Sequence, residues 1–298
     1  MMKFTLASRH KDEGTRERFF YEWSMIHVAL MLTTPSVPYK LFKRYVQHYG
    51  VQGVTNDMLI HPFSDQGWES FADHLVEKYE DVIASVRELD YVQRMQPHSF
   101  GSHRFITSLS TYDTVYEREG FQSGGIKLIH FLKKKPELSV EEFNRRFKEQ
   151  HAPALAKLFK SKPLVRKYVQ DYSLELDPAI FKGTLFEFGS IGLYAGIEEI
   201  WLDGVDAVAR LRQGPETYDA IRKSEESFVD AEGSISMVVN ERVVYDFVSP
   251  TERTPLPAIL NPHSLEAAID RQGYTDFDKR TIPSPAALLG KSAAQKLS

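Results

Sequence analysis

The sequence predicts an α+β fold built from ferredoxin-like units, in which the elements follow in the order β-α-β-β-α-β. Residues 124–248 indicate this order directly, because short apolar runs alternate there with stretches of helical periodicity. A fainter repeat begins with the apolar run Met25–Leu32, about a hundred residues before the corresponding run Ile126–Leu132. The length of 298 residues favours two such modules, since a domain averages roughly 150 residues.

The composition is that of an ordinary globular protein, with 42% hydrophobic and 26% charged residues. The 37 basic and 41 acidic residues give a net charge of −4, which argues against a nucleic-acid partner. No apolar run approaches the roughly 18 residues that span a membrane, and the absence of cysteine excludes disulfides and thiolate chemistry. The start of the sequence lacks an apolar leader, so we expect a cytoplasmic protein without a membrane partner.

The first part of the chain is expected to hold an arm and a degenerate module. Residues 1–23 are charged and aperiodic, which is typical of an N-terminal arm, and the module then spans residues 24–123. Its expected elements are a strand over 25–32, a helix over 37–49, a short strand over 58–61, a helix over 68–89 and a strand over 103–112. A Gln-Ser-Gly-Gly stretch at 122–125 then predicts a flexible boundary.

The second module, residues 124–248, gives clearer signals. Its first strand is followed by Ser139 and Glu142, a capping box that predicts the start of a helix with Phe143, Phe147 and His151 on one face. The remaining expected elements are strands over 166–172 and 192–203, a helix over 205–228 interrupted at 214–215, and a strand over 238–247. The Pro- and Ser-rich residues 249–298 are expected to form an extended C-terminal strap.

Four motifs of the second module resemble the EthD family of the dimeric α/β-barrel superfamily. They are IKLIHFLKKKPEL, HAPALAKL at the end of the helix stripe, VRKYVQDYSLE, and the strand GIEEIWLD that opens into a helix. The resemblance covers residues 124–248, with a weak echo over 24–116. It implies two four-stranded sheets packed into a barrel, closed by two chains or by two tandem modules, with a mostly apolar pocket for a ligand.

Three residues are predicted to carry the chemistry. His151 follows Phe147 on the apolar helix face, where an imidazole can act as a general acid or base; the alternative is a structural histidine that braces the following Ala-Pro turn. His130 shares a strand face with Leu128 and either lines a cavity or is a satisfied core residue. Tyr168 can donate a hydrogen bond to a developing oxyanion, or serve only as a large wall residue.

A second group of residues is predicted to bind the substrate. Glu199 and Trp201 share one strand face, where the carboxylate has a raised pKa if it is functional, or pairs with a nearby Lys or Arg if it is structural. In the first module, His27 interrupts an apolar run and Tyr49 stands at the place matching His151. The other residues expected to line the pocket are Phe131, Phe147 and Tyr245.

Short motifs argue against most cofactors. Histidine and carboxylate spacings suit no metal site, and neither a Gly-x-Gly-x-x-Gly nor a Walker A loop is present. The resemblance implies a cofactor-independent enzyme for a hydrophobic aromatic or polyketide-like molecule. Lyase chemistry such as decarboxylation, dehydration or aldol-type cyclisation is expected first. The alternatives are a cofactor-free monooxygenase, a haem protein, or a non-catalytic ligand-binding module; a homodimer is a further expectation.

Overall fold

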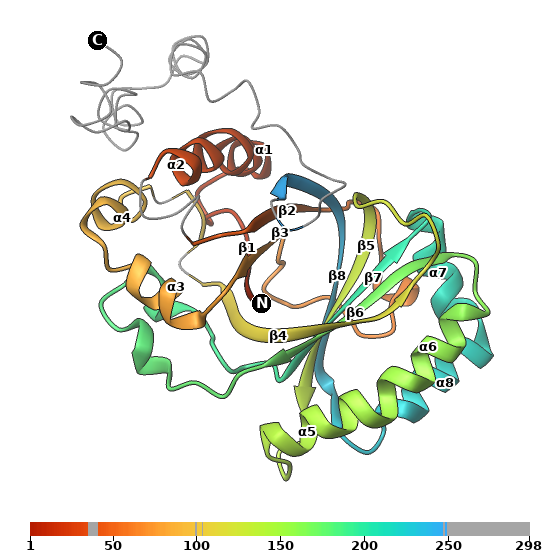
Figure 1. Ribbon diagram of the computed structural model, residues 1–298. Helices are drawn as coiled ribbons and strands as arrows, with labels where there is room; N and C mark the ends of the chain where they lie inside the picture. Colours follow the sequence, from red (N-terminus) through yellow and green to blue (C-terminus); the bar gives the residue numbers. More distant parts are fainter. Residues whose placement is uncertain (35–40, 99, 103, 247, 249–298) are drawn as a thin grey trace.

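The structure, a computed structural model, describes residues 1–34, 41–98, 100–102, 104–246 and 248. Its centre is a closed barrel of eight antiparallel strands in the order β1-β3-β2-β8-β5-β7-β6-β4 (Figure 1). The strands are β1 Met2–Ser8, β2 Arg44–Gly50, β3 Ser70–Val76, β4 Ile106–Glu117, β5 Gly125–Lys134, β6 Val165–Ser173, β7 Gly196–Leu202 and β8 Val229–Asp246. The α+β class is therefore confirmed, and the barrel closes within one chain.

Helical segments follow the first and third strands of each half. Those of the first half lie on one side of the barrel and those of the second half on the opposite side (Figure 1). The helices are α1 Arg16–Tyr21, α2 Val28–Thr33, α3 Tyr79–Ser85, α4 Leu89–Arg94, α5 Val140–Arg146, α6 Ala152–Lys160, α7 Val205–Gln213 and α8 Pro215–Glu225. Two π-helical turns, η1 Glu22–His27 and η3 Phe147–His151, join α1 to α2 and α5 to α6.

The two halves share a side-chain pattern on equivalent strands. β2 carries YVQHY at 45–49, and β6 carries YVQDY at 168–172. In both strands the glutamine amide donates to the first tyrosine hydroxyl and accepts a hydrogen bond from the second. In the strand registers, Lys3 takes the place in the first half that Lys127 takes in the second half. Lys3 lies opposite Leu75 of β3, and Lys127 lies opposite Trp201 at the equivalent place of β7.

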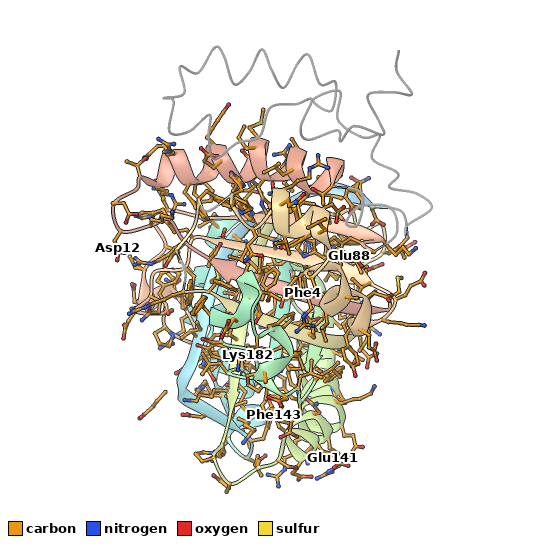
Figure 2. All side chains as sticks on the ribbon, turned by 90° about the vertical axis from the view of Figure 1, so that its left-hand side faces the viewer. Phe4, Asp12, Glu88, Glu141, Phe143 and Lys182 are labelled. Carbon is orange, nitrogen blue, oxygen red and sulfur yellow. The ribbon has the colours of Figure 1, made fainter. Side chains whose placement is uncertain are left out.

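Side chains alternate between the barrel interior and the helix-covered outer face, as expected for strands. One end of the interior is apolar, with Phe71, Phe131 and Met237 among its residues. The other end holds charged groups around Lys3 and Lys127. On the outer face each half has its own core; Phe4 and Phe143, labelled in Figure 2, belong to these two cores.

The second half follows the expected elements closely. Helix α5 starts where the capping box predicts, and the Ser139 hydroxyl accepts a hydrogen bond from the Glu142 amide at 3.1 Å. The interruption at 214–215 separates α7 from α8. Gly196 opens β7 because a Cβ there would lie 2.9 Å from the rings of Phe143 and Phe147, so the helix packs directly on the backbone. β8 begins nine residues before the expected start, at Val229 rather than 238.

The expected N-terminal arm is wrong, because residues 2–8 form β1 in the barrel wall between β3 and β4. Met25–Leu32 is not a strand but the end of η1 and most of α2. Val28, Ala29 and Leu30 are all buried, so this helix is apolar around most of its circumference. Such a short apolar run has the same sequence pattern as a buried strand.

Three other expectations in the first half fail for a related reason. Residues 68–89, which are expected to form one helix, contain β3 followed by α3. Residues 37–49 are also expected to form a helix, but residues 44–49 belong to β2, and residues 35–40 lie outside the described ones. The strand expected over 58–61 falls on a short 3₁₀ turn, η2 Asn56–Met58, and the loop after it. In β3 the polar Asp73 and His74 are buried with their apolar neighbours, so polar residues in this strand do not indicate a face exposed to solvent.

The strand patterns of the two halves do not match in the alignment that the sequence predicts. The expectation pairs Tyr49 with His151, whereas the strand pattern pairs Tyr49 with Tyr172. His27 and His151 correspond instead, since each is the last residue of a π-helical turn. The expected strap, residues 249–298, lies outside the described residues. Within the described residues, no helix is long and apolar enough to span a bilayer.

Candidate functional site

An apolar cavity of about 110 Å³ lies between the sheet and the helices of the first half. Its lining comes from β1, η1, α2 and the residues after α4. Leu185 and Phe186, from the connection between β6 and β7 in the second half, also line it. Aromatic and apolar side chains dominate the wall: Phe4, Leu6, Trp23, Met31, Phe42, Val86, Tyr91, Phe100, Phe105, Leu185 and Phe186.

Three histidines line this cavity, and two of them, His74 and His98, leave a ring nitrogen without a protein partner among the described residues. His98 Nε2 lies 3.0 Å from Glu22 Oε2, and its Nδ1 has no hydrogen bond. His74 Nδ1 lies 3.2 Å from the Phe4 carbonyl oxygen, and its Nε2 has no hydrogen bond. The half-buried His27 ring packs against Phe100 and His98, with centroids 5.2 and 6.1 Å apart.

The apolar surroundings keep two of these imidazoles neutral. Burial lowers the pKa of His27 well below its ordinary value, and the nearby His98 and His74 lower it further. Burial also lowers the pKa of His74 to about 4, although the Phe4 carbonyl and Asp73 act in the opposite direction. The Glu22 carboxylate holds the His98 ring through Nε2, so that Nδ1 is the nitrogen without a partner among the described residues. A neutral imidazole with a free lone pair can accept a proton from a bound molecule.

The predicted residues His151, His130 and Tyr168 do come together, around Glu198 on β7. His151 Nε2 lies 2.7 Å from Glu198 Oε1, His130 Nδ1 lies 3.0 Å from Oε2, and the Tyr168 hydroxyl donates to Oε1. The second nitrogen of His151, Nδ1, lies 2.8 Å from Ser224 Oγ. His151 is fully buried and lines neither the apolar cavity nor the cavity at the barrel end described below.

The charges in this cluster stabilise one another. Burial opposes the charged form of His151, but the attraction of Glu198 outweighs it and raises the pKa of His151 above its ordinary value. Burial likewise opposes ionisation of Glu198, yet His151 and His130 hold its pKa well below the usual range. Burial and the neighbouring Glu198 raise the pKa of Tyr168. These contacts differ from the structural alternative, a brace on the following Ala-Pro turn, because the two ring nitrogens of His151 lie beside the side chains of Ser224 and Glu198.

The predicted Glu199 and Trp201 point into the barrel, away from His151. Glu199 Oε2 accepts a hydrogen bond from Lys127 Nζ at 2.5 Å, and its other oxygen accepts one from Lys3. Burial alone would raise the pKa of Glu199, but the two ammonium groups lower it far below the usual range. This direction is opposite to the raised pKa expected for a functional carboxylate. Trp201 stacks on Lys127, whose Nζ lies 3.9 Å from the ring centroid.

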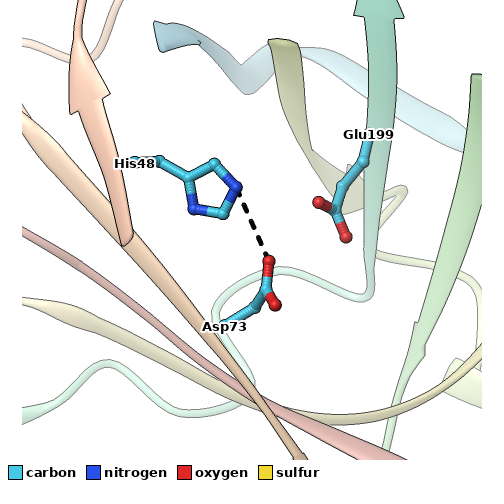
Figure 3. Close-up of side chains that lie close together, drawn as sticks. All are labelled: His48, Asp73 and Glu199. Atoms are coloured by element: carbon cyan, nitrogen blue, oxygen red, sulfur yellow. Dashed lines mark ion pairs between the residues drawn. The ribbon is translucent and has the colours of Figure 1, made fainter. Parts of the chain in front are cut away.

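His48, Asp73 and Glu199 form a metal-like cluster inside the barrel (Figure 3). The ammonium of Lys127 occupies its centre, with Nζ 2.7 Å from His48 Nε2 and 2.8 Å from Glu241 Oε2. A cation of the protein therefore fills the position that a metal ion would take. Beside this cluster, a cavity of about 310 Å³ at the barrel end is lined by Lys3, Tyr112 and Trp201 among others.

The remaining predicted residues lie in three different places. Phe147 stacks on His151, with ring centroids 5.7 Å apart. Phe131 lies in the apolar end of the barrel. Tyr49 and Tyr245 belong to the first-half core region, and the Tyr245 hydroxyl donates to the Phe42 carbonyl at 3.3 Å.

Among the residues of these sites that were not predicted are Glu22, His74, His98 and Glu198. A signal existed for Glu198, because it precedes Glu199 on a strand and must therefore face the helices when Glu199 faces the barrel. The other three come together only through the tertiary fold, since Glu22, His74 and His98 lie on separate elements.

Comparisons with known proteins agree with this architecture. The EthD domain model matches residues 135–232, which lie in the second half of the chain. No curated protein matches the sequence. A solved structure described as an anthrone oxidase-like protein is 13% identical with a TM-score of 0.54, covering 84% of this chain and 95% of that one. At this identity the likeness establishes the fold alone.

Two further solved structures are less similar. A mutant chlorite dismutase from Candidatus Nitrospira defluvii is 12% identical with a TM-score of 0.41, covering 88% of this chain and 95% of its own. A dimeric ferredoxin-like protein from Thermobifida fusca is 19% identical with a TM-score of 0.27, covering 41% of this chain and 96% of its own.

Proposed function

We propose that this protein is an enzyme that binds a small aromatic molecule in the first-half cavity and moves a proton there. One observation carries the proposal: an aromatic, apolar wall meets imidazole nitrogens that have no partner among the described residues. The cavity of about 110 Å³ favours a single ring, since an apolar cavity of roughly 150 Å³ holds benzene. A bound ring carrying a hydroxyl would satisfy both the apolar wall and a free nitrogen.

His98 is the acid–base residue in this proposal, and Glu22 positions it. His98 Nδ1 accepts the proton of a ring hydroxyl or of an acidic C–H, and the imidazolium formed is paired with the Glu22 carboxylate 3.0 Å away. His74 Nε2 accepts a second hydrogen bond from the ligand, because its Nδ1 proton points to the Phe4 carbonyl. His151 is less suited to this step, since both of its nitrogens already have protein partners.

The substrate anion left by this proton transfer can follow either of two routes. In the lyase chemistry expected from the sequence, a substrate that carries a carboxylate loses carbon dioxide and its carbon takes a proton from the imidazolium, or a substrate that carries a hydroxyl next to the anionic carbon loses it as water with that same proton. Electron transfer from the anion to molecular oxygen gives a cofactor-free oxygenation. The description of the similar solved structure as anthrone oxidase-like favours this second route. Both routes need the same base.

Haem does not fit the cavity in this arrangement. A porphyrin carries four pyrrole rings, whereas the volume of about 110 Å³ matches about one ring. The histidines that line the cavity are therefore better placed to hydrogen-bond a small ligand than to ligate a haem iron.

The matching YVQHY and YVQDY strands also favour an origin of the two halves as copies of one ferredoxin-like module. The homodimer and the cytoplasmic location stay predictions.

The test uses 4-nitrophenol, a single-ring phenol whose phenolate absorbs visible light. We expect the wild-type protein to bind it and to shift its ionisation towards the phenolate, because His98 and Glu22 stabilise the transferred proton. His98→Gln keeps the side-chain volume and should retain binding within a few-fold while losing the shift. Once a substrate is found, the same variant should lower the rate by at least about a hundredfold.

His10→Gln serves as the matched control, because His10 also pairs with a carboxylate, Glu69, at 2.7 Å but lies outside the cavity. It should behave as wild type in both measurements. Binding without any change of ionisation in wild type would favour the non-catalytic binding module. Failure of the wild-type protein to bind the probe would contradict the proposed site.

A further inference from the structure

Three buried polar atoms without a partner among the described residues meet on the outer face of the second-half sheet. They are His61 Nδ1, His130 Nε2 and Ser236 Oγ, and each residue is at most 1% exposed. His130 on β5 lies directly opposite Ser236 on β8 in the strand register. The Ser236 amide donates to the carbonyl of Pro62 at 2.8 Å, which places the neighbouring His61 beside the same strand pair.

Each of the two imidazoles is held by a carboxylate through its other nitrogen. His61 Nε2 lies 3.2 Å from Glu225 Oε1, and His130 Nδ1 lies 3.0 Å from Glu198 Oε2. Arg222 in turn holds the second oxygen of Glu225 at 3.0 Å. A histidine that donates one N–H to a carboxylate and presents its other nitrogen as a free lone pair is the arrangement found around protein-bound metal ions.

The placement of the two rings suits a shared ligand. Their centroids are 5.0 Å apart and their planes are inclined by 85°. Two imidazoles that bind one tetrahedral zinc ion through Zn–N bonds of about 2.0 Å have centroids about 5 Å apart. Burial lowers the pKa of His130, mainly through loss of hydration, so its ring is in the neutral form that a metal ion requires.

We propose that His61, His130 and Ser236 bind a divalent transition-metal ion of the Zn²⁺ class. The two imidazole nitrogens are donors that Zn²⁺ prefers, the Ser236 hydroxyl adds a weaker oxygen donor, and the carboxylates of Glu198 and Glu225 offset the charge of the ion. These two carboxylates also lie close together, since ligand atoms of His151, Glu198 and Glu225 are within 4.8 Å of one another. The ion would join the β2–β3 connection of the first half to the sheet of the second half.

The site is independent of the proposed acid–base function, because none of its residues lines the apolar cavity. It also differs from the cluster of His48, Asp73 and Glu199 in Figure 3, because the ammonium of Lys127, which the figure does not draw, lies 2.7 Å from His48 Nε2. Between His61 and His130 the described residues supply no such cation to the two free nitrogens.

The experiment is dialysis of the full chain against Zn²⁺ followed by elemental analysis, with Co²⁺ as a visible-absorption probe. We expect one tightly held Zn²⁺ per chain and the intense visible bands of tetrahedral Co²⁺. His61→Gln should lower the affinity at least about tenfold, as should His130→Gln, and Ser236→Ala should weaken it less. His61 is in a connection rather than a strand, so its variant tests the site even if His130→Gln fails to fold.

His98→Gln is the matched control, since His98 is also buried, carboxylate-paired and free at one nitrogen, but is not part of this group. It should bind Zn²⁺ as wild type does. The proposal is overturned if folded wild type retains no metal ion, which would leave a buried water as the partner of the three atoms. It is also overturned if His61→Gln, shown to be folded by circular dichroism, binds Zn²⁺ with unchanged affinity.

Discussion

The buried histidines differ in how many of their ring nitrogens have a protein partner. His151 has two, Ser224 and Glu198, and is therefore fixed in position and charge state. His98 has one, Glu22, and faces an apolar cavity with the other nitrogen. A nitrogen that the fold leaves free can accept a proton directly from a ligand, whereas a nitrogen with a protein partner must first exchange that partner, and this difference underlies the role proposed for His98.

His151→Gln is therefore expected to act mainly on stability. Removing the imidazole leaves the Glu198 carboxylate buried without its closest cation, and breaking a buried ion pair costs about 3–5 kcal/mol. Because the folded-state pKa of His151 is raised above its ordinary value, its contribution is complete below about pH 6.5 and is lost as the pH rises through the folded-state pKa. Urea unfolding of both proteins across this pH range measures the effect.

His10→Gln provides the comparison at a more exposed ion pair, with a change in unfolding free energy of at most about 1 kcal/mol. If His151→Gln unfolds at the same urea concentration as wild type but loses turnover, the catalytic role predicted for His151 from the sequence would stand instead.

At the scale of elements, local motifs decide where helices begin and which way their side chains point. The π-helical turns η1 and η3 each end in a histidine, His27 or His151, on the sheet-facing side of their helices. In the second half, Phe143 and Phe147 fill the space next to this histidine and contact Phe228. In the first half the residues four and eight positions before His27 are also buried aromatics, Trp23 and Phe19, and Trp23 lines the apolar cavity.

Ser139→Ala tests the cap of α5, which the sequence predicts and the structure confirms. The variant removes the hydroxyl that accepts a hydrogen bond from the Glu142 amide, so we expect a loss of about 1 kcal/mol in the free energy of unfolding. Ser139→Asp keeps an acceptor and should unfold within a few tenths of a kcal/mol of wild type. Equal losses in the two variants would show that the hydroxyl does not act as a cap.

At the scale of the whole molecule, each half covers the other. The first-half residues Leu59, Ile60 and His61 pack on the second-half core, and Phe181 and Phe186 of the second half pack on the first-half core. Strands of the two halves also pair with each other at two places in the barrel, β2 with β8 and β4 with β6. We therefore expect the two halves to unfold together.

Deletion of residues 1–8 tests this dependence. β1 pairs with β3 on one side and β4 on the other, and its Lys3 forms a buried ion pair with Asp171 of the second half. Without this strand the barrel has two unpaired edges and Asp171 loses its cation, so we expect loss of cooperative thermal unfolding. A truncated protein with the wild-type transition would mean that these residues are a dispensable arm.

The sequence by itself determined the α+β class and the elements of the second half. There, polar and apolar residues separate by face on the helix, and the cap, the helix interruption and the strand lengths are local signals. In the first half, polar residues are buried together with apolar ones, so polar and apolar residues do not separate by face; they are Gln47, His48, Asp73 and His74. The sequence pattern therefore predicts helices where the structure has strands.

Only the tertiary structure decided where a ligand has room. The cavity wall combines η1, the residues after α4 and a connection from the other half, and the three free atoms of the proposed metal site come from β5, β8 and a first-half connection. Hydrophobic periodicity records which residues are buried, but not which distant residue is the neighbour. The free nitrogens of His98 and His130 arise from those neighbours, and so sequence spacing could not show them.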